Sequence, residues 1–209
     1  MHRFITFEGI EGSGKTTQIQ LLSNTLEERG VEHVLTREPG GTAIGDQIRK
    51  VVLNPDNAGM TSTTELMLYA AARAQHIDQV IRPAIEAGRM VLCDRFVDAT
   101  RAYQGHGRGL PLDLIEELHA LEVLALVPDR TILFDLDPAR ALDRARARDA
   151  HRRSDENRFE QEDLAFHVRV REGYRELARR EPKRIVVVDA DGPIEVVQER
   201  VLKAMGPLP

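Results

Sequence analysis

The chain has 209 residues, a formal net charge of −5 and a single cysteine, Cys93. The negative charge disfavours binding of nucleic acid through a basic surface field, the lone cysteine excludes an internal disulfide and suits a reducing cytoplasm, and no apolar run reaches the roughly 18 residues of a membrane span. The first residues lead into an apolar strand, so we expect no signal peptide. These features predict one cytoplasmic domain over residues 1–209 that binds neither nucleic acid nor membranes.

The first predicted element is an apolar strand at 3–8, followed by the segment GIEGSGKT at 9–16. This segment matches the phosphate-binding pattern G-x-x-x-x-G-K-[ST], and apolar side chains at helical spacing follow it. Backbone N–H groups at such a helix start attract anionic oxygens, which favours a nucleoside triphosphate site over a glycine-rich surface turn. Lys15 would reach the β- and γ-phosphates, and the Thr16 hydroxyl would hold Mg²⁺. The residues predicted to bind ATP here are Gly9, Ile10, Glu11, Gly12, Ser13, Gly14, Lys15, Thr16 and Thr17.

Strands and helices alternate along the rest of the chain. Short apolar runs rich in β-branched residues predict strands at 4–7, 33–36, 90–93, 131–134 and 184–188. Helical spacing of apolar residues predicts helices at 17–29, 44–53, 64–87, 112–123, 138–150, 163–180 and 194–205. This alternation predicts an α/β fold with a five-stranded parallel sheet flanked by helices and buried on both faces. Ligands should then gather at the carboxyl ends of the strands.

Polar side chains follow the second and third predicted strands. At 37–42, Pro39 and two glycines set an unusual backbone path, unless the segment is a plain surface turn. Asp94 suits a Mg²⁺ ligand or an orienting base, and Arg95 offers a guanidinium fork for a phosphate oxygen. The alternative for these two residues is a surface ion pair.

Two further segments carry side chains suited to a planar base. Tyr103 and Gln104 place an aromatic wall beside an amide that can donate and accept hydrogen bonds, although such a tyrosine is more often a partly buried core residue. Tyr69 and Arg73 share a helix face at i and i+4, next to small alanines. Arg49, on the preceding helix, is by itself typical of a solvated residue.

An arginine-rich region follows the fourth predicted strand. The most polar stretch, 151–162, is expected to be a mobile loop between two helices. Arginines crowd the region, at Arg144, Arg146, Arg148, Arg152, Arg153 and Arg158. Acidic neighbours would neutralise them, so this cluster alone favours a solvated helix face over a phosphate site.

Taken together, these segments resemble thymidylate kinases, enzymes that phosphorylate dTMP with ATP. The resemblance rests on the order and spacing of GIEGSGKTT at 9–17, TREPGGT at 36–42, IRKVVL at 48–53, YAAARAQ at 69–75, DRF at 94–96, TRAYQGHGRG at 100–109, the segment 136–148 and RFEQED at 158–163. It implies a three-layer P-loop NTPase fold with a short mobile lid at about 148–162. It further implies Mg²⁺, a homodimer and a role in dTTP synthesis for DNA replication.

The resemblance also implies a dTMP site. Arg49 and Arg95 would hold the phosphate, Tyr69 would stack on thymine, and Arg73 would donate to thymine O4. Tyr103 would crowd the sugar 2′ position, whereas Glu11 would contact the 3′-hydroxyl, and Thr100 and Gln104 would make polar contacts to the base. The implied set is Glu11, Pro39, Arg49, Tyr69, Arg73, Arg95, Thr100, Tyr103 and Gln104. The resemblance further predicts a cis peptide bond at Glu38–Pro39.

The catalytic groups are implied in the same way. Some members of the family carry a catalytic arginine inside the phosphate loop, where this chain has Gly12, so the arginine is expected from the lid. Arg158 matches the lid motif best, and Arg153 is the alternative because the lid is longer than the simplest family pattern. The predicted catalytic set is Lys15, Asp94, Arg95, Arg158 and Arg153; the predicted metal ligands are Thr16 and Asp94; and Arg144 joins the ATP site.

Two other classes compete with this reading. A kinase for another small molecule could share the fold, but Arg49 and Arg95 argue against an uncharged nucleoside as acceptor. A GTP-driven switch would read guanine through an N-K-x-D motif, and the chain has no Asn-Lys pair.

Overall fold

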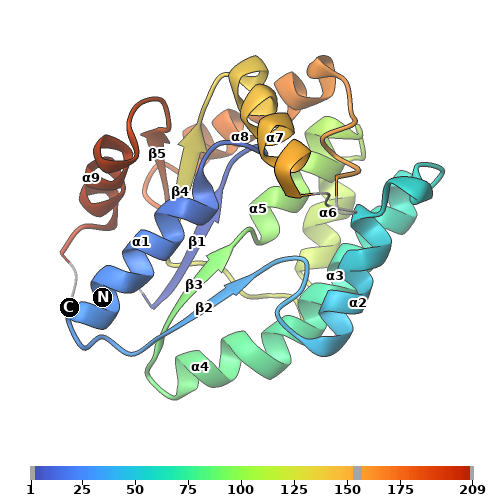
Figure 1. Cartoon of the computed structure of the whole chain (residues 1–209). Helices are drawn as coiled ribbons and strands as arrows, with labels where there is room; N and C mark the ends of the chain where they lie inside the picture. The colour runs from blue at the N-terminus through green and yellow to red at the C-terminus, as the bar shows by residue number, and fades with distance from the viewer. Residues whose placement is uncertain (1–2, 153–156, 208–209) are drawn as a thin grey trace.

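The computed structural model describes residues 3–152 and 157–207. Five parallel strands form one sheet in the order β2-β3-β1-β4-β5 (Figure 1). Their bounds are β1 Phe4–Glu8, β2 His33–Arg37, β3 Met90–Asp94, β4 Arg130–Asp135 and β5 Ile185–Asp189. The predicted α/β architecture with a five-stranded parallel sheet is therefore confirmed, and each predicted strand has its counterpart.

The central strands are apolar because both of their faces are covered. Every residue of β1 is buried, as are the first four of β3, which is the pattern of a parallel sheet between two helical layers. The polar groups inside are paired, as where the Thr6 and Thr131 hydroxyls lie 2.7 Å apart across β1 and β4. Of the two edge strands, β2 has only half-buried and exposed positions, whereas β5 mixes buried and exposed ones.

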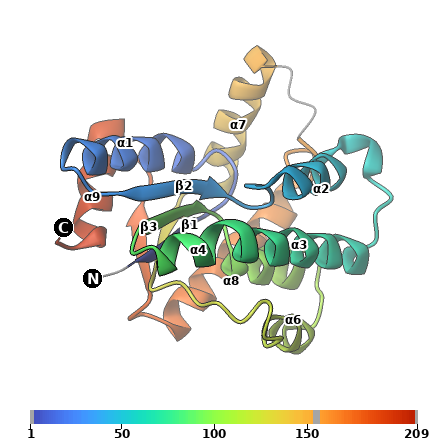
Figure 2. The same cartoon turned by 90° about the horizontal axis from the view of Figure 1, so that it is seen from below.

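Helices cover both faces of the sheet. Helices α1 and α9 lie on one face, and α4 and α8 lie on the other (Figure 2). The bounds are α1 Lys15–Glu28, α2 Ala43–Leu53, α3 Ser62–His76, α4 Arg82–Glu86, α5 Val97–Thr100, α6 Leu112–His119, α7 Pro138–Arg152, α8 Leu164–Arg180 and α9 Ile194–Met205. Within 3–152 and 157–207, no helix combines the length and the apolar character needed to cross a bilayer.

The helix boundaries follow local capping chemistry. Thr61 accepts a hydrogen bond from the Thr64 N–H and so starts α3, and Asp137 accepts one from the Ala139 N–H before α7. The predicted helix 64–87 is divided into α3, a π-helical segment Ile77–Ile81 and α4. A second π-helical segment, Arg101–Gly107, follows α5 and was not predicted.

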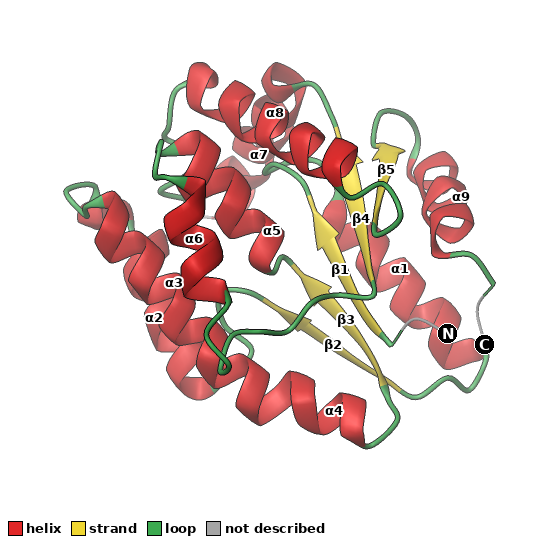
Figure 3. Ribbon diagram, turned by 180° about the vertical axis from the view of Figure 1, so that it is seen from behind, coloured by secondary structure: helices red, strands yellow, loops and turns green. Residues whose placement is uncertain are grey.

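The five strands run in the same direction, so their carboxyl ends lie at one edge of the sheet (Figure 3). The loops after β1, β2 and β3 therefore meet at one edge of the sheet, as expected for ligand binding. Helices α2 and α3 pack together beside this edge, and α8 packs along the segment Arg101–Gly107.

Candidate active site

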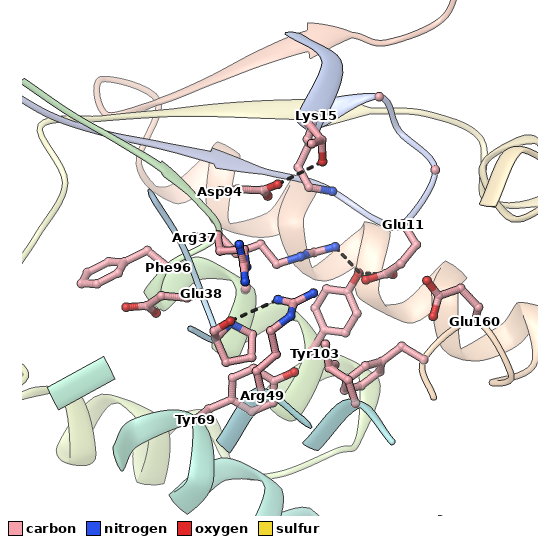
Figure 4. A pocket seen from close by; sticks show the side chains of 18 of the residues that line it. Glu11, Lys15, Arg37, Glu38, Arg49, Tyr69, Asp94, Phe96, Tyr103 and Glu160 are labelled. Carbon is pink, nitrogen blue, oxygen red and sulfur yellow. Dashed lines mark hydrogen bonds and ion pairs between the residues drawn. The ribbon is translucent and has the colours of Figure 1, made fainter. Parts of the chain in front are cut away.

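A cavity of about 900 Å³ opens at the carboxyl edge of the sheet. Side chains from the loop after β1 and from α1, β2, β3, α2 and α3 face it (Figure 4). Most of the predicted site residues line it: Glu11, Gly12, Gly14, Lys15, Thr16, Thr17, Pro39, Arg49, Tyr69, Arg73, Asp94, Arg95, Tyr103, Gln104 and Arg144. The triphosphate and monophosphate sites predicted separately from the sequence thus belong to one continuous space.

The phosphate loop has the backbone that its glycines permit. Gly9, Gly12 and Gly14 all have positive φ, and Gly14 is the N-cap of α1. The Lys15 ammonium is buried, and it donates to the carbonyl oxygens of Gly9 and Ile10, each at 2.9 Å. Burial and the neighbouring charge of Arg95 lower the pKa of Lys15 to about 8. Anionic phosphate oxygens near this ammonium would favour its charged form.

Gly12 has no room for any side chain. Its φ is +73°, and a Cβ atom there would lie 1.9 Å from the Ala141 carbonyl oxygen of α7. Helix α7 therefore packs directly against the loop at the position where other family patterns place an arginine. An arginine inside this loop is incompatible with this packing.

Thr16 and Asp94 face each other across the loop. The Thr16 hydroxyl donates to Asp94 Oδ2 at 3.3 Å, and Asp94 Oδ1 is buried without a hydrogen-bond partner in the described part of the chain. Two oxygens of this kind fit a hard cation such as Mg²⁺. No cluster of three or more His, Cys, Asp or Glu side chains suited to a metal occurs among residues 3–152 and 157–207. A metal held here would need phosphate oxygens or water to complete its coordination.

Arg95 is fixed beside the loop by an anion and an aromatic ring. It has the left-handed φ of 69°, its Nη2 donates to Glu11 Oε1 at 2.7 Å, and its guanidinium lies 4.9 Å from the centre of the Tyr103 ring. The Tyr103 hydroxyl donates to the other oxygen of Glu11 at 2.6 Å. Burial alone would raise the pKa of Glu11, but Arg95 and Lys15 outweigh it, so the pKa is lowered.

A buried carboxyl group supports Arg95 from behind. Glu8 has no exposed surface, and it accepts hydrogen bonds from the Phe96 N–H and the Tyr174 hydroxyl, each at 2.7 Å. The Tyr174 hydroxyl in turn accepts from Arg95 Nη1 at 3.3 Å. Burial, with the nearby charge of Asp98, raises the pKa of Glu8 to about 8.

Arg73 is almost entirely buried, with 1% of its surface exposed. Its Nε donates to Glu38 Oε2 at 2.7 Å, and its Nη2 donates to the Thr100 hydroxyl at 3.0 Å. His119 Nε2 lies 2.5 Å from Arg73 Nη1, and burial together with Arg73 lowers the pKa of His119 to about 4. His119 is therefore neutral at pH 7 and can accept from Arg73. Thr100, for which a polar contact to the base is predicted, binds Arg73 and is not among the residues that line the cavity, so its contact to the base stays a prediction.

Another arginine that lines the cavity, Arg49, is held by the segment after β2. Its Nη1 donates to the Pro39 carbonyl oxygen at 3.1 Å. The Glu38–Pro39 peptide bond is cis, as predicted. Tyr69 is half-buried and faces the same space, and burial raises the pKa of its hydroxyl, which keeps it neutral.

Comparison with known proteins decides which family this geometry represents. The family model for thymidylate kinase matches residues 7–201. The chain belongs to the thymidylate kinase family. It is 54% identical over 202 residues to a thymidylate kinase of Syntrophotalea carbinolica, covering 96% of this chain and 94% of that protein. It is 51% identical over 208 residues to that of Desulfosudis oleivorans, with 99% and 97% covered.

Solved structures agree with this assignment. A crystal structure of thymidylate kinase from Ehrlichia chaffeensis superposes with a TM-score of 0.78 at 37% identity, and the match covers 97% of each chain. The three-layer P-loop fold that the sequence predicted is thus the fold of this thymidylate kinase.

The two predicted lid arginines have different outcomes. Arg153 lies outside the described residues. Arg158 is 5% exposed and does not line the cavity, because its Nε donates to the Val52 carbonyl oxygen at 2.6 Å and its Nη2 donates to Glu65 Oε2 at 2.5 Å. Its predicted catalytic role stays a prediction, and in this conformation Arg158 is a buried ion-pair partner.

Several residues of the thymidylate kinase site were missed by the sequence reasoning. The partners that hold the arginines come from distant parts of the chain: Glu38, Glu65, His119 and Tyr174 bind them directly, and Glu8 binds the Tyr174 hydroxyl. Further residues line the cavity without having been predicted: Gln20, Arg37, Glu38, Leu53, Phe96, Ala99, Phe159 and Glu160. Charged residues inside apolar runs, such as Glu8 in FITFE, were the available signal, because an unpaired carboxylate is costly to bury.

Proposed function

We propose that this thymidylate kinase transfers the γ-phosphoryl group of ATP to dTMP, giving ADP and dTDP in the cytoplasm, for dTTP synthesis. The observation that carries the proposal is the single cavity that joins Lys15 and the phosphate loop to Arg49, Arg73 and Arg95. Such a space suits two phosphorylated nucleotides whose phosphates meet. The guanidinium groups place positive charge in the cavity, although the net charge of the whole chain is −5.

In this scheme the dTMP phosphate oxygen is already a competent nucleophile. Positioning and charge stabilisation then account for most of the catalysis. Arg49 and Arg95 hold the acceptor in line, while Lys15 and the loop amides neutralise charge on the transferred group. Thr16 and Asp94 would hold Mg²⁺, which would supply positive charge beside the phosphate groups of ATP.

The base and sugar would be recognised at the other end of the cavity. Tyr69 offers a ring for stacking, Arg73 offers a donor for thymine O4, and Gln104 offers an amide. Glu11 and Tyr103 already form a hydrogen-bonded pair at 2.6 Å, which fits contact with the 3′-hydroxyl and steric exclusion of a 2′-hydroxyl.

We further propose that an arginine of the lid at about 148–162 completes the charge around the transferred group. Arg158 would have to leave both Val52 and Glu65 to do so. The single variants Arg153→Ala and Arg158→Ala decide between them: the catalytic residue should lower kcat by about 10²–10⁴-fold with a smaller change in the KM for dTMP. If neither variant lowers kcat, the lid proposal is wrong.

A substrate panel tests the reaction itself. ADP release is measured with ATP, Mg²⁺ and each deoxynucleoside monophosphate. dTMP should be the best acceptor, and dUMP should react more weakly because one methyl group contributes only about 1–3 kcal/mol. dAMP and dGMP should give almost no turnover. Equal rates with dGMP, or ADP release that needs no acceptor, would reject the proposal.

The proposed homodimer has a separate test. Met67 on α3 and Leu114 on α6 are large apolar side chains that lie exposed on the monomer, which is consistent with a covered face in a dimer. Light scattering coupled to size-exclusion chromatography should give twice the mass of 23.5 kDa. A monomer at micromolar concentration would contradict this part of the proposal.

A further inference from the structure

Glu65 is a buried carboxylate that the proposed mechanism does not use. It lies in the first turn of α3 and has no exposed surface. It accepts hydrogen bonds from Gln104 Nε2 at 2.8 Å, from Arg108 Nε and Nη2 at 3.3 and 3.2 Å, and from Arg158 Nη2 at 2.5 Å. Two guanidinium groups thus neutralise the carboxylate while one of its oxygens also binds an amide.

This contact fixes which way round the Gln104 amide lies. An ionised carboxylate can only accept hydrogen bonds, so the NH₂ group of Gln104 must face Glu65 and its carbonyl oxygen must face elsewhere. Gln104 is 1% exposed and lines the cavity. The hydrogen bonds of the described residues, 3–152 and 157–207, include none to its Oε1. An acceptor oxygen in the cavity wall requires a donor when a ligand excludes water.

The neighbouring wall of the cavity offers a hydrogen-bond donor, whereas Gln104 offers an acceptor. Arg73 also lines the cavity. Its hydrogen bonds to Glu38, His119, Phe96 and Thr100 use four of the five N–H donors of the guanidinium, which leaves one N–H, on Nη1. A guanidinium donor and an amide acceptor in one base pocket match an edge that carries a carbonyl oxygen next to an N–H. Thymine and uracil have such an edge, whereas cytosine has an amino group and an unprotonated ring nitrogen there.

We infer that Glu65 is a specificity-determining positioning residue, which holds Gln104 with its carbonyl oxygen toward the base and thereby selects a pyrimidine with a ring N–H over cytosine. The inference rests on the proposed function, because it assumes that the base lies against Gln104. Arg108 and Arg158 contribute to the same arrangement: they neutralise Glu65, and Arg158 connects it to the described end of the predicted lid.

The test compares dTMP with 5-methyl-dCMP, which keeps the methyl group and the sugar and differs only on the base edge. For wild type and Glu65→Gln, kcat/KM is measured with each nucleotide. The side-chain amide introduced by this substitution would offer Gln104 both a donor and an acceptor. The Gln104 amide could then flip and exchange the positions of its oxygen and nitrogen. The preference for dTMP over 5-methyl-dCMP should fall at least about tenfold in the variant, with part of the change arising from better use of 5-methyl-dCMP. General destabilisation would lower both substrates alike and leave this ratio unchanged.

A double-mutant cycle identifies Gln104 as the group through which Glu65 acts. In a Gln104→Ala background, Glu65→Gln should change the substrate ratio by less than about twofold, because the amide that it orients is absent. Glu162→Gln is the matched control, since Glu162 also binds Arg108, at 2.5 Å, but does not contact Gln104; it should leave the ratio unchanged. If Glu65→Gln does not fold, Glu65→Asp keeps the charge beside both arginines, moves it away from Gln104 and should lower the ratio in the same direction.

The outcomes separate the inference from the proposed function. A wild-type enzyme that prefers dTMP, together with a Glu65→Gln variant that keeps the full preference, overturns the inference alone. Additive effects of the two substitutions would also overturn it. A wild-type enzyme that does not phosphorylate dTMP would reject the proposed function instead.

Discussion

The two ends of the cavity are constructed differently. At the donor end, defined as the phosphate loop 9–17, one contiguous segment supplies the binding groups, and even the Lys15 ammonium is held by carbonyl oxygens of its own loop. At the base end, defined as Arg73 and Gln104, each polar group is held by a buried carboxylate from another segment: Glu38 for Arg73 at 2.7 Å and Glu65 for Gln104 at 2.8 Å.

This difference shows how anion binding and base recognition use the fold. Phosphate oxygens accept hydrogen bonds from many directions, so main-chain amides at a helix start are sufficient. A base edge has a fixed order of donors and acceptors, so the side chains that read it must be fixed in orientation. Buried acceptors such as Glu38 and Glu65 provide that orientation, and they tie the base end to the stability of the whole domain.

The largest expected effect tests the donor end. Lys15→Ala should lower kcat by at least about 10³-fold, because it removes a charge aimed at the transferred group. Since Lys15 binds only its own loop in the described structure, dTMP affinity should stay within a few fold of wild type. Steady-state kinetics and equilibrium binding of dTMP measure these two quantities. Lys50→Ala, at an exposed position of α2, is the control and should behave as wild type.

Arg73→Leu should affect both recognition and stability. It leaves Glu38 buried with the His76 ring as a remaining side-chain partner, with Nδ1 at 3.0 Å from Oε1, and loss of one member of a buried ion pair costs about 3–5 kcal/mol. Urea unfolding should show this loss, together with a fall in kcat/KM for dTMP. Arg180→Ala, which removes an exposed ion pair with Glu176, should cost less than about 1 kcal/mol. Similar losses for the two variants would contradict the buried role of Arg73.

Gly12→Ala tests the packing of α7 on the phosphate loop. The added Cβ would meet the Ala141 carbonyl oxygen at 1.9 Å, and forced overpacking costs about 1–3 kcal/mol. The KM for ATP should rise as the loop moves. Gly30→Ala has a similar φ of +70° with no heavy atom within 4 Å of the new Cβ, so the difference between the two variants in thermal unfolding isolates the contact. Equal melting temperatures would show that α7 moves away from the added methyl group without a loss of stability.

The last expected effect appears only as a dependence of stability on pH. The pKa of Glu8 is about 8 in the folded protein and 4.5 ordinarily, so between these values the unfolded chain loses the proton that the folded chain keeps. This contribution to stability is fully present below pH 4.5 and is lost as the pH rises through 8. The free energy of unfolding of wild type relative to Glu8→Gln should therefore fall by up to about 1.4 kcal/mol per pH unit in that window. Parallel urea titrations from pH 5 to pH 8 measure it, and a constant difference would mean that Glu8 stays ionised.

The sequence predicted the donor end more completely than the base end. Strand, glycine loop and helix are adjacent in the chain, so the position of Lys15 follows from local backbone chemistry. The resemblance also placed Arg73 and Gln104 correctly on the cavity wall. It gave no indication that the Thr100 hydroxyl accepts a hydrogen bond from Arg73, because spacing along α5 does not reveal contacts to another helix. It likewise gave no indication that Arg158 pairs with a carboxylate 93 positions away.

What the amino-acid sequence determined by itself is the family, the parallel sheet and most of the residues that face the cavity, because each depends on short segments with their own periodicity and turn chemistry. What only the tertiary structure decided is how those side chains are held. Glu8, Glu38 and Glu65 each bind a partner far along the chain, and a buried carboxylate is stable only where folding brings donors to it. The direction of each donor and acceptor in the cavity is therefore a property of the folded domain.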